Sequence, residues 1–337
     1  MRRWLHRGVR AAVWLTAAAG AFLAYVLFPA SRPQLTFPEG KRFALTIVDD
    51  TDQTTLERAK PLYEVLERAG LRTTKTVWSL PTAPDNVPTD QGVALTDPDY
   101  RAWILELQRK GFEIALHGVR GGSSERAATQ AGLDEFQRLV GADPRLHVNH
   151  ALNRENLYWG EHRWSFAPYR WAFGLARPYP FTGHVEGSPY FWGDLAQTRL
   201  KYVRRFTFQD IDVLRANPWM PYRVPGQGYV QYWFDGADGG SIDQFEQLLS
   251  DQNLDRLERD GGVSLVYAHL GAGSFNRSGE ADPRFVDRIQ AVARRNGWFV
   301  PASRILDHLA SQPGWTPQPS FRQQLQLDTW FILDKVF

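Results

Sequence analysis

The chain has 337 residues, of which 43% are hydrophobic and 23% are charged, so it can bury a large core in one sizeable domain or two small ones. Its formal net charge is only +2 and no dense basic patch follows residue 42, which argues against a nucleic-acid partner. There is no cysteine, which excludes a thiol-based site and a lipidated cysteine.

The N-terminal end combines basic and apolar residues. Arg2, Arg3, Arg7 and Arg10 precede a run from 11 to 30 that is almost entirely apolar. A run of this length is enough to span a bilayer, and basic flanking residues tend to stay in the cytoplasm. A cleaved signal peptide has the same layout, but the large residues just before position 30 do not suit a cleavage site. The sequence therefore favours an uncleaved anchor.

This anchor sets the expected location of the rest of the chain. We expect a single-pass inner-membrane protein whose C-terminal domain lies in the periplasm or otherwise outside the cytoplasm. The absence of cysteine is compatible with such a domain. The expected segments are a cytoplasmic tail at 1–10, the transmembrane anchor at 11–30 and a linker at 31–41.

After the linker, strand-like and helix-like patterns alternate with hardly a break. The expected strands are 43–48, 72–79, 112–117, 145–150, 181–186, 201–208, 228–234, 263–269 and 298–301. The expected helices are 56–69, 98–110, 125–140, 242–250, 283–296 and 303–311.

Repetition of this kind predicts a parallel sheet, and its length favours a barrel. An open doubly wound sheet is the alternative, but no glycine-rich phosphate loop follows the first strand, so we expect no nucleotide cofactor. The predicted fold class is α/β, a distorted parallel (β/α)7–8 barrel. The barrel is expected at 42–311, with an aromatic-rich insertion at about 151–226 and a C-terminal extension at 312–337.

The first expected strand ends abruptly in acid. An apolar run at 43–48 is followed by Asp49, Asp50 and, after one threonine, Asp52. Three carboxylates this close repel one another unless a cation, a proton transfer or a polar ligand compensates. Asp52 or Thr54 could cap the next helix, but capping leaves Asp49 and Asp50 unexplained. This cluster is therefore a candidate functional site.

Other polar residues end the later strands. In a parallel barrel the working residues gather at the C-terminal ends of the strands, so these residues form a ring. Five of the eight histidines fall at such ends, and although a single histidine is more often structural, we expect three of the five to be functional. The ring comprises Asp49, Asp50, His117, His147, His150, His184, Glu186, Asp235 and His269.

Three segments of this ring resemble the motifs of a known family. They are Thr-Ile-Val-Asp-Asp-Thr at 46–51, Leu-His-Gly-Val-Arg-Gly at 116–121 and Val-Tyr-Ala-His-Leu at 266–270. The chain resembles the polysaccharide deacetylase family, carbohydrate esterases related to the nodulation-factor N-deacetylase. That family has Thr-Phe-Asp-Asp-Gly on its first strand, His-Ser/Thr-x-x-His on its third and Leu-x-His near its end. The resemblance covers roughly 42–150 and 228–311.

The resemblance implies a role for four residues. Asp49 would be the general base, Asp50 and His117 would be metal ligands, and His269 would be the general acid. A divalent, zinc-like metal would lower the pKa of a bound water and polarise an acetyl carbonyl. The implied function is hydrolysis of acetyl groups on a polysaccharide or oligosaccharide of the envelope or of an exported glycan.

One position departs from the family. Gly121 stands where the family has its second metal-binding histidine, and a zinc-type site needs three protein ligands. His150 could supply the third ligand, or Asp52 could, and a third possibility is that no metal binds. If Arg120 filled the gap beside His117 instead, its charge would repel a divalent cation and neutralise Asp50.

The aromatic-rich segment supplies the candidate substrate contacts. Between 158 and 234 lie six tryptophans and eight tyrosines, whose rings can stack on sugar faces or form the segment's own core. Arg154 and Glu155, where the family's Arg-Pro-Pro-Tyr-like motif is missing, could line the barrel mouth or pair with each other. The expected substrate contacts are Arg154, Glu155, Trp159, Glu186, Trp192 and Asp235.

Two other functions remain open at the level of sequence. A glycoside hydrolase on a related barrel needs two carboxylates across a cleft, for which Asp49 or Asp50 with Glu186 or Asp235 are candidates. A catalytically inactive polysaccharide-binding component of an assembly or export system is the other alternative.

Overall fold

The computed structural model describes residues 34–83, 91–176 and 179–336, together with some of the residues between 13 and 25. The predicted cytoplasmic tail and most of the predicted anchor at 11–30 lie outside the described residues. Within the described part, no helix is both long and apolar enough to cross a bilayer. The anchor therefore stays a prediction.

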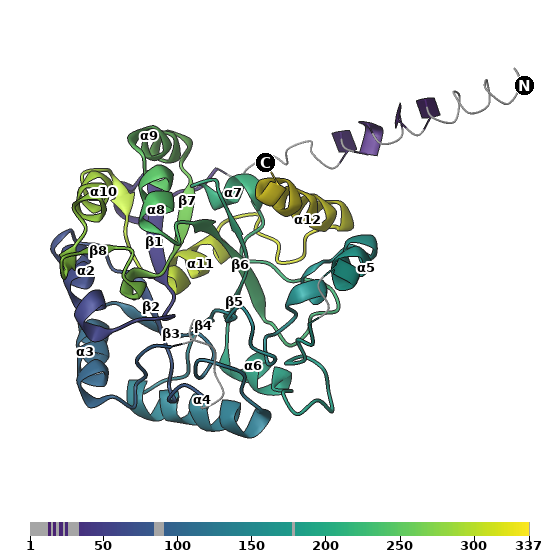
Figure 1. The fold of residues 1–337 in the computed structure, drawn as a ribbon. Coiled ribbons are helices and arrows are strands. Elements are labelled where there is room, and N and C mark those ends of the chain that lie inside the picture. The colour runs from purple at the N-terminus through teal and green to yellow at the C-terminus, as the bar shows by residue number, and fades with distance from the viewer. Residues whose placement is uncertain are drawn as a thin grey trace, which may run out of the picture.

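A parallel barrel forms the centre of the protein (Figure 1). The sheet runs in the order β10-β1-β2-β3-β4-β5-β6-β7, and pairing of β1 with β7 closes it. The barrel strands are β1 (Phe43–Asp49), β2 (Thr74–Val77), β3 (Glu113–Leu116), β4 (Leu146–His147), β5 (Tyr202–Phe208), β6 (Tyr232–Asp238), β7 (Val263–Ala268) and β10 (Gly297–Trp298). The predicted α/β barrel is thus confirmed, with seven strands in the closed ring.

Sequence pattern explains the central strands. Every residue of β1 is buried, as expected of a strand covered on both faces, and this is why 43–48 reads as a continuous apolar run.

Helices cover the outside of the sheet (Figure 1). They are α2 (Leu56–Arg68), α3 (Pro98–Arg109), α4 (Arg126–Val140), α6 (Gly193–Arg199), α7 (Val213–Ala216), α8 (Ile242–Leu248), α9 (Asp251–Asp260), α10 (Pro283–Ala293) and α11 (Ala302–Ala310). A hairpin of β8 (Asn276–Arg277) and β9 (Glu280–Ala281) lies outside the barrel.

The expected strand at 181–186 is wrong. This segment consists of turns, closed by backbone bonds such as Val185 N to Thr182 O. Its alternation of large and small residues comes from local packing, since the ring of Phe181 lies against Gly160, where a Cβ would meet it at 2.7 Å. Strand β5 divides the expected insertion, so the long connection runs from β4 to β5.

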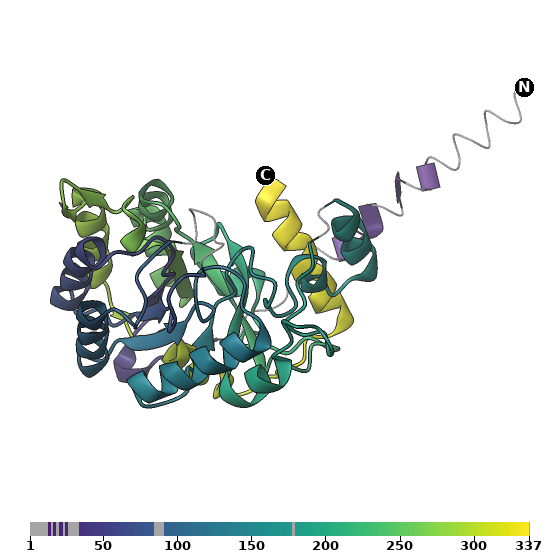
Figure 2. The same cartoon turned by 60° about the horizontal axis from the view of Figure 1, so that its bottom comes forward.

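Two helices that the sequence did not predict lie together at one side of the barrel. They are α5 (Ala167–Ala176) and α12 (Phe321–Val336), and Figures 1 and 2 both place them away from α2 and α3. Trp164 connects them, because its ring lies 5.5 Å from that of Phe173 and 5.8 Å from that of Phe331, between centroids. The expected C-terminal extension is therefore part of the domain's core.

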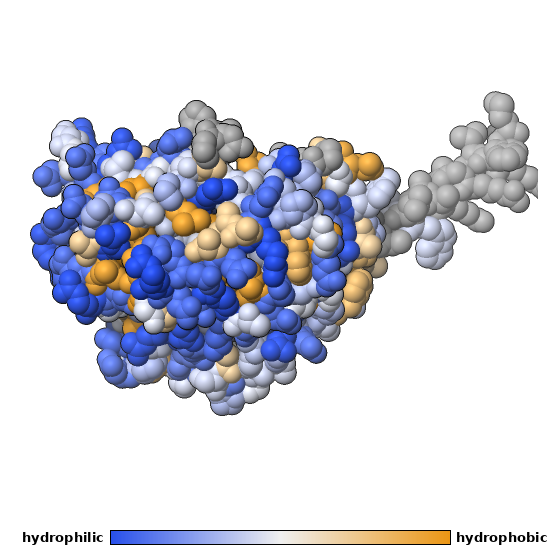
Figure 3. Space-filling view, turned by 90° about the horizontal axis from the view of Figure 1, so that it is seen from below, coloured by the Kyte–Doolittle hydropathy of each residue, from blue (hydrophilic) through white to orange (hydrophobic). Residues whose placement is uncertain are grey.

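The face of the protein shown in Figure 3 is mainly hydrophilic. On the face shown in Figure 3, apolar residues form small scattered groups among charged ones. Scattered exposed apolar residues are normal for a folded domain, so this face carries no sign of a large apolar interface.

Candidate active site

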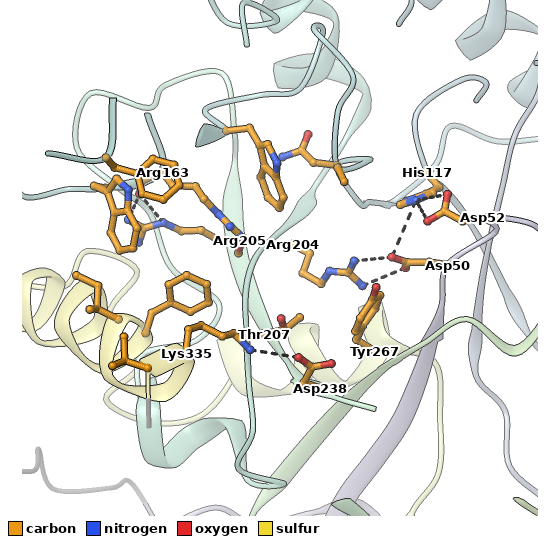
Figure 4. Close-up of a pocket in the computed structure, with 18 residues that line it drawn as sticks. Asp50, Asp52, His117, Arg163, Arg204, Arg205, Thr207, Asp238, Tyr267 and Lys335 are labelled. Atoms are coloured by element: carbon orange, nitrogen blue, oxygen red, sulfur yellow. Dashed lines mark hydrogen bonds and ion pairs between the residues drawn. The ribbon is translucent and has the colours of Figure 1, made fainter. Parts of the chain in front are cut away.

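A pocket of about 720 Å³ opens at the C-terminal ends of the barrel strands (Figure 4). One end is polar and contains Asp50, Asp52 and His117, while the other is mostly aromatic and aliphatic. Three arginines lie along it, and the C-terminal part of α12 forms one wall. The pocket is lined by Asp50, Asp52, His117, Asn149, Ala151, Trp159, Arg163, Trp164, Phe173, Arg204, Arg205, Thr207, Asp238, Tyr267, Phe331, Ile332, Lys335 and Val336.

Three histidines converge on Asp52 at the polar end. Asp52 Oδ1 lies 3.1 Å from Nε2 of His117 and 3.1 Å from Nε2 of His150, and Asp52 Oδ2 lies 3.0 Å from Nε2 of His269. Burial alone would raise the pKa of Asp52, but contacts with the three imidazoles hold this pKa well below its usual value. Asp50 also belongs to the cluster, 4.0 Å from His117. The predicted convergence of Asp50, His117 and His269 is thus confirmed.

The turn after β1 brings Asp52 into the pocket. Gln53 adopts a positive φ of 55°, and Thr54 N donates to Thr51 O, which folds the chain back over the barrel mouth. Helix α2 is capped by Thr55, whose side chain accepts from Arg58 N at 3.3 Å. None of the three acids is the cap, so capping does not explain the acidic cluster.

Asp52, His117 and His150 fit a divalent metal ion. Their ligand atoms lie within 4.8 Å of one another, and Asp52 Oδ1 is buried without a hydrogen-bond donor. His150 Nδ1 lies 3.0 Å from Asn153 Oδ1, which can only accept, so Nδ1 carries a proton and Nε2, 3.1 Å from Asp52 Oδ1, is the ring atom available to a metal. A lone pair and a carboxylate oxygen at that distance need a cation or a proton between them, and two histidines with one carboxylate are a zinc-type donor set.

A relay of hydrogen bonds orients His150. Asn153 Nδ2 donates to Glu155 Oε1 at 2.9 Å, and Glu155 Oε2 accepts from Ser124 N at 2.9 Å. Such partners fix the tautomer and direction of a ligand imidazole. Glu155 is buried, and its burial raises its pKa to about 7. This places Glu155 behind His150 rather than among the substrate contacts, which corrects the sequence-based expectation.

His150 lies beside His117 in the cluster. The two ring centroids are 5.2 Å apart. Arg120 turns away, with its guanidinium donating to Ser124 Oγ at 3.1 Å and Ser123 O at 3.2 Å. The cation that neutralises Asp50 is therefore another residue.

That cation is Arg204, from β5. Its Nη1 and Nη2 lie 3.0 and 2.5 Å from the two carboxylate oxygens of Asp50, and both side chains are almost fully buried. The register of β5 against β6 shifts after Arg204, an irregularity that can redirect a side chain. The group that unites His117 and His150 contains Asp52 in place of the expected Asp50, because Asp50 is committed to this bidentate pair.

Asp49 is sealed in the core, which corrects its expected role as general base. It has no exposed surface, and its carboxylate contacts Lys75 Nζ at 2.9 Å, Tyr63 Oη at 2.9 Å and Leu270 N at 2.8 Å. Neither Asp49 nor Lys75 lines the pocket. A proton transfer from an attacking water to Asp49 would require the core to open.

His269 contacts the second carboxylate oxygen of Asp52, Oδ2, at 3.0 Å. Burial alone would lower its pKa, but the carboxylates of Asp52, Asp50 and Asp49 outweigh burial and raise the pKa of His269. Tyr267 Oη lies 3.2 Å from its Nε2. A smaller pocket of about 280 Å³ lies on this side and includes Asp52, His150 and His269. Asp52 therefore lies between two cavities.

The expected substrate contacts separate into two groups. Trp159 lines the pocket, Arg154 is exposed beside the ring of Tyr190, and Glu186 is exposed and accepts from Tyr229 Oη. Trp192 and Asp235 are wrong as substrate contacts because both are buried. Trp192 Nε1 donates to Glu155 O, and the carboxylate of Asp235 binds the side chains of Asn217 and Tyr222 and the backbone of Phe206.

Sequence reasoning missed the arginines of the pocket. Arg204 and Arg205 are adjacent inside a strand that is otherwise apolar and aromatic, and two long cations in such a strand are a signal of paired buried charge. Arg163 gave no comparable signal, since it lies in a short 3₁₀ turn, η3 (Gly160–Arg163).

Comparison with known proteins adds a likeness of fold. No protein-family profile matches the chain, and no curated protein sequence matches it. Among solved structures, a candidate polysaccharide deacetylase from Mycobacterium smegmatis is 16% identical, with a TM-score of 0.51 over 87% of this chain and 98% of that one. The Puue allantoinase is 13% identical, with a TM-score of 0.46 over 85% and 96%. An acetyl xylan esterase of family 4 from Clostridium thermocellum is 14% identical, with a TM-score of 0.39 over 83% and 95%.

Identities this low show a likeness of fold alone. The Mycobacterium smegmatis structure, with a TM-score of 0.51, is the one that supports this likeness. The likeness agrees with the resemblance that the motifs at 46–51, 116–121 and 266–270 indicate. The chain thus shares the overall fold of the Mycobacterium smegmatis structure.

Proposed function

We propose that this protein is a metal-dependent hydrolase that removes acyl groups from a glycan. The observation that carries the proposal is the convergence of Asp52, His117 and His150 on one point at the wall of an open pocket, with His269 beside them. Asp52, His117 and His150 would hold the metal, which when bound supplies an activated water and polarises the acyl carbonyl.

The chain's own residues would handle the protons. Asp50 lines the pocket and is the carboxylate nearest to the cluster that is not among its three ligands, so we assign it as the proton acceptor, oriented by the guanidinium of Arg204. His269, whose pKa is raised, would be protonated and would donate to the leaving amine or hydroxyl, with Tyr267 fixing its ring.

A glycoside hydrolase fits this geometry less well. Of the carboxylates considered for it, Asp49 and Asp235 are completely buried, and Glu186 lies outside the pocket. Of this set, Asp50 alone lines the pocket. Two accessible carboxylates across a cleft are the requirement for glycosidic cleavage, so acyl transfer to water is the better match.

Metal binding and hydrolysis by the purified protein test the proposal. Zinc titrations should give one site in the wild type and no measurable binding for His150→Ala or Asp52→Asn, while acetate release from an acetylated glycan should be lost in both. His308→Ala is the matched control, because His308 packs against Trp298 away from the pocket. Equal zinc affinity in the wild type and His150→Ala would overturn the ligand set, and a wild type that binds no divalent metal would overturn the mechanism.

We also propose that the domain lies outside the cytoplasm, held to the membrane by residues 11–30. The basic-then-apolar N-terminus and the absence of cysteine support this location. Protease added to spheroplasts should digest the domain while the N-terminal tail stays protected. A mature N-terminus near Ser31 in cell envelopes would instead mean that the segment is cleaved.

A further inference from the structure

The three arginines of the pocket differ in their partners. Arg204 is paired with Asp50, and Arg205 donates to Asp328 at 3.0 Å. Arg163 forms no ion pair with any residue in the described part of the chain. It is therefore the pocket's one arginine without a protein counter-ion among the residues described at 34–83, 91–176 and 179–336.

The surroundings of Arg163 make the lack of a counter-ion energetically unfavourable. Its guanidinium carbon lies 3.7 Å from the ring centroid of Trp159 and 5.2 Å from those of Phe206 and Phe331. Nη2 donates to the backbone oxygen of Arg205, while Nε is buried with no hydrogen-bond partner. Burial and the charge of Arg205 outweigh the carboxylate of Asp235 and lower the pKa of Arg163 to about 9, so the side chain is still charged at pH 7. A half-buried cation with no ion-pair partner is unfavourable unless an anion compensates.

The pocket itself is the place from which such an anion can come. Arg163 lies at the end of the pocket away from His117 and Asp52, with Arg204 and Arg205 between (Figure 4). Among the described residues, the other lysine or arginine that lines the pocket is Lys335, which is already bound to Asp238 at 3.2 Å. Two nearby acids are likewise occupied. Asp328 also accepts from Ser165 N and Phe166 N, and Asp235 accepts from Asn217, Tyr222 and Phe206 N.

Building on the proposed function, we propose that Arg163 binds a negatively charged group of the substrate, so that the pocket selects an acidic glycan over a neutral one. A carboxylate or a phosphate has the required chemistry, because both accept parallel hydrogen bonds from a guanidinium. Trp159, stacked on Arg163, holds the guanidinium plane in place and offers its ring edge to the adjoining sugar. The acyl group would then lie at the Asp52 end and the anionic group at the Arg163 end of the same ligand.

Titration calorimetry with matched charged and neutral probes tests whether the pocket prefers an acidic glycan. The neutral probe is chitotetraose, the carboxylate probe is a hyaluronan tetrasaccharide, and N-acetylglucosamine 1-phosphate is compared with N-acetylglucosamine for the phosphate. The wild type should bind at least one charged probe at least 10-fold more tightly than its neutral counterpart, and the pair that shows the difference identifies the anion. Arg163→Gln should remove this preference by weakening the binding of the charged probe far more than that of its neutral counterpart, and Arg163→Lys should keep part of the preference.

The control is Arg223→Gln, since Arg223 also stacks on an aromatic ring, that of Tyr232 at 4.7 Å, but lies outside the pocket. Arg223→Gln should keep the full preference. Equal wild-type affinity for charged and neutral probes would overturn the inference, whether or not Arg163→Gln folds. Equal weakening of all probes in Arg163→Gln would show a structural role for Arg163 and would overturn it as well.

Binding is measured without turnover, so the two proposals can fail separately. A protein that prefers charged probes but releases no acetate would refute the hydrolase and leave the anion site standing. A protein that deacetylates chitotetraose and hyaluronan equally well, with no preference in binding, would support the hydrolase and refute the anion site.

Discussion

The ion pair of Asp49 and Lys75 lies where the resemblance would put a catalytic base, yet neither side chain has exposed surface. Removing one member would leave the other charge buried and unpaired, so Lys75→Met should lower the free energy of unfolding by about 3–5 kcal/mol. Urea unfolding measures this loss. The double variant Lys75→Met/Asp49→Asn should recover a large part of it.

Lys110→Met is the control for that experiment, because Lys110 forms exposed pairs with Glu67 and Glu106. Its effect should be below about 1 kcal/mol. An equally small loss for Lys75→Met would contradict the view that the pair holds the first strand end in place.

Glu155 gives the protein a pH dependence of its own. Its folded-state pKa of about 7 lies above the ordinary 4.5, so the protonated form is favoured by folding. The resulting stability is complete below pH 4.5 and is lost as pH rises through 7. The wild type should therefore lose up to about 3 kcal/mol relative to Glu155→Gln between pH 4.5 and pH 8. Glu186→Gln, at an exposed site, should show no such change in parallel denaturant titrations, and a flat difference for Glu155→Gln would refute the raised pKa.

At the scale of elements, α12 is held to the barrel by a buried charge as well as by its aromatic rings. Asp328 has no exposed surface and accepts from Arg205 and from the backbone of Ser165 and Phe166. Asp328→Ala should cost about 3–5 kcal/mol and should loosen α12 first, because all three of its partners lie outside that helix. Limited proteolysis that cuts near 321–336 in the variant and not in the wild type would report this loosening, whereas Val336→Ala, at an exposed position of the same helix, should resist cleavage as the wild type does.

The elements that the sequence predicted are those whose pattern is local. The run at 43–48 and the helix patterns at 56–69 and 98–110 appear within a few residues of their expected bounds, since burial on one face dictates the periodicity. Helices α5 and α12 were missed because their apolar residues face each other and the insertion, a contact between segments far apart in sequence. The residue pattern within each helix does not predict that contact.

The candidate site could likewise be predicted only in part from the sequence. The strand ends predicted that His117, His150 and His269 would meet Asp50, because the ends of parallel strands share one face. The exchange of Asp50 for Asp52 beside His117 could not be predicted, because it depends on Arg204, 154 residues away from Asp50, and on one turn at Gln53.

At the scale of the whole molecule, the number of paired residues differs from one pair of neighbouring barrel strands to another. Strands β1 and β7 are paired from Ala44 with Val263 to Asp49 with Ala268, whereas β3 and β4 share the single pair of Leu116 with His147. Regions with few ladder bonds open at lower free energy, so amide hydrogen exchange should be fastest, among the barrel strands, at β4. Peptides covering 44–49 and 263–268 should exchange slowest. Protection at 146–149 equal to that of β1 would contradict this order.

Helix α12 has a practical consequence for work on this protein. Its last turns contribute Phe331, Ile332, Lys335 and Val336 to the pocket wall. A purification tag or reporter fused directly after this helix would therefore start at the pocket's rim, where it can obstruct ligand entry or, if acidic, occupy the cationic end. Assays and crystals of the tagged and the tag-cleaved protein should be compared before a lack of activity is attributed to the site itself.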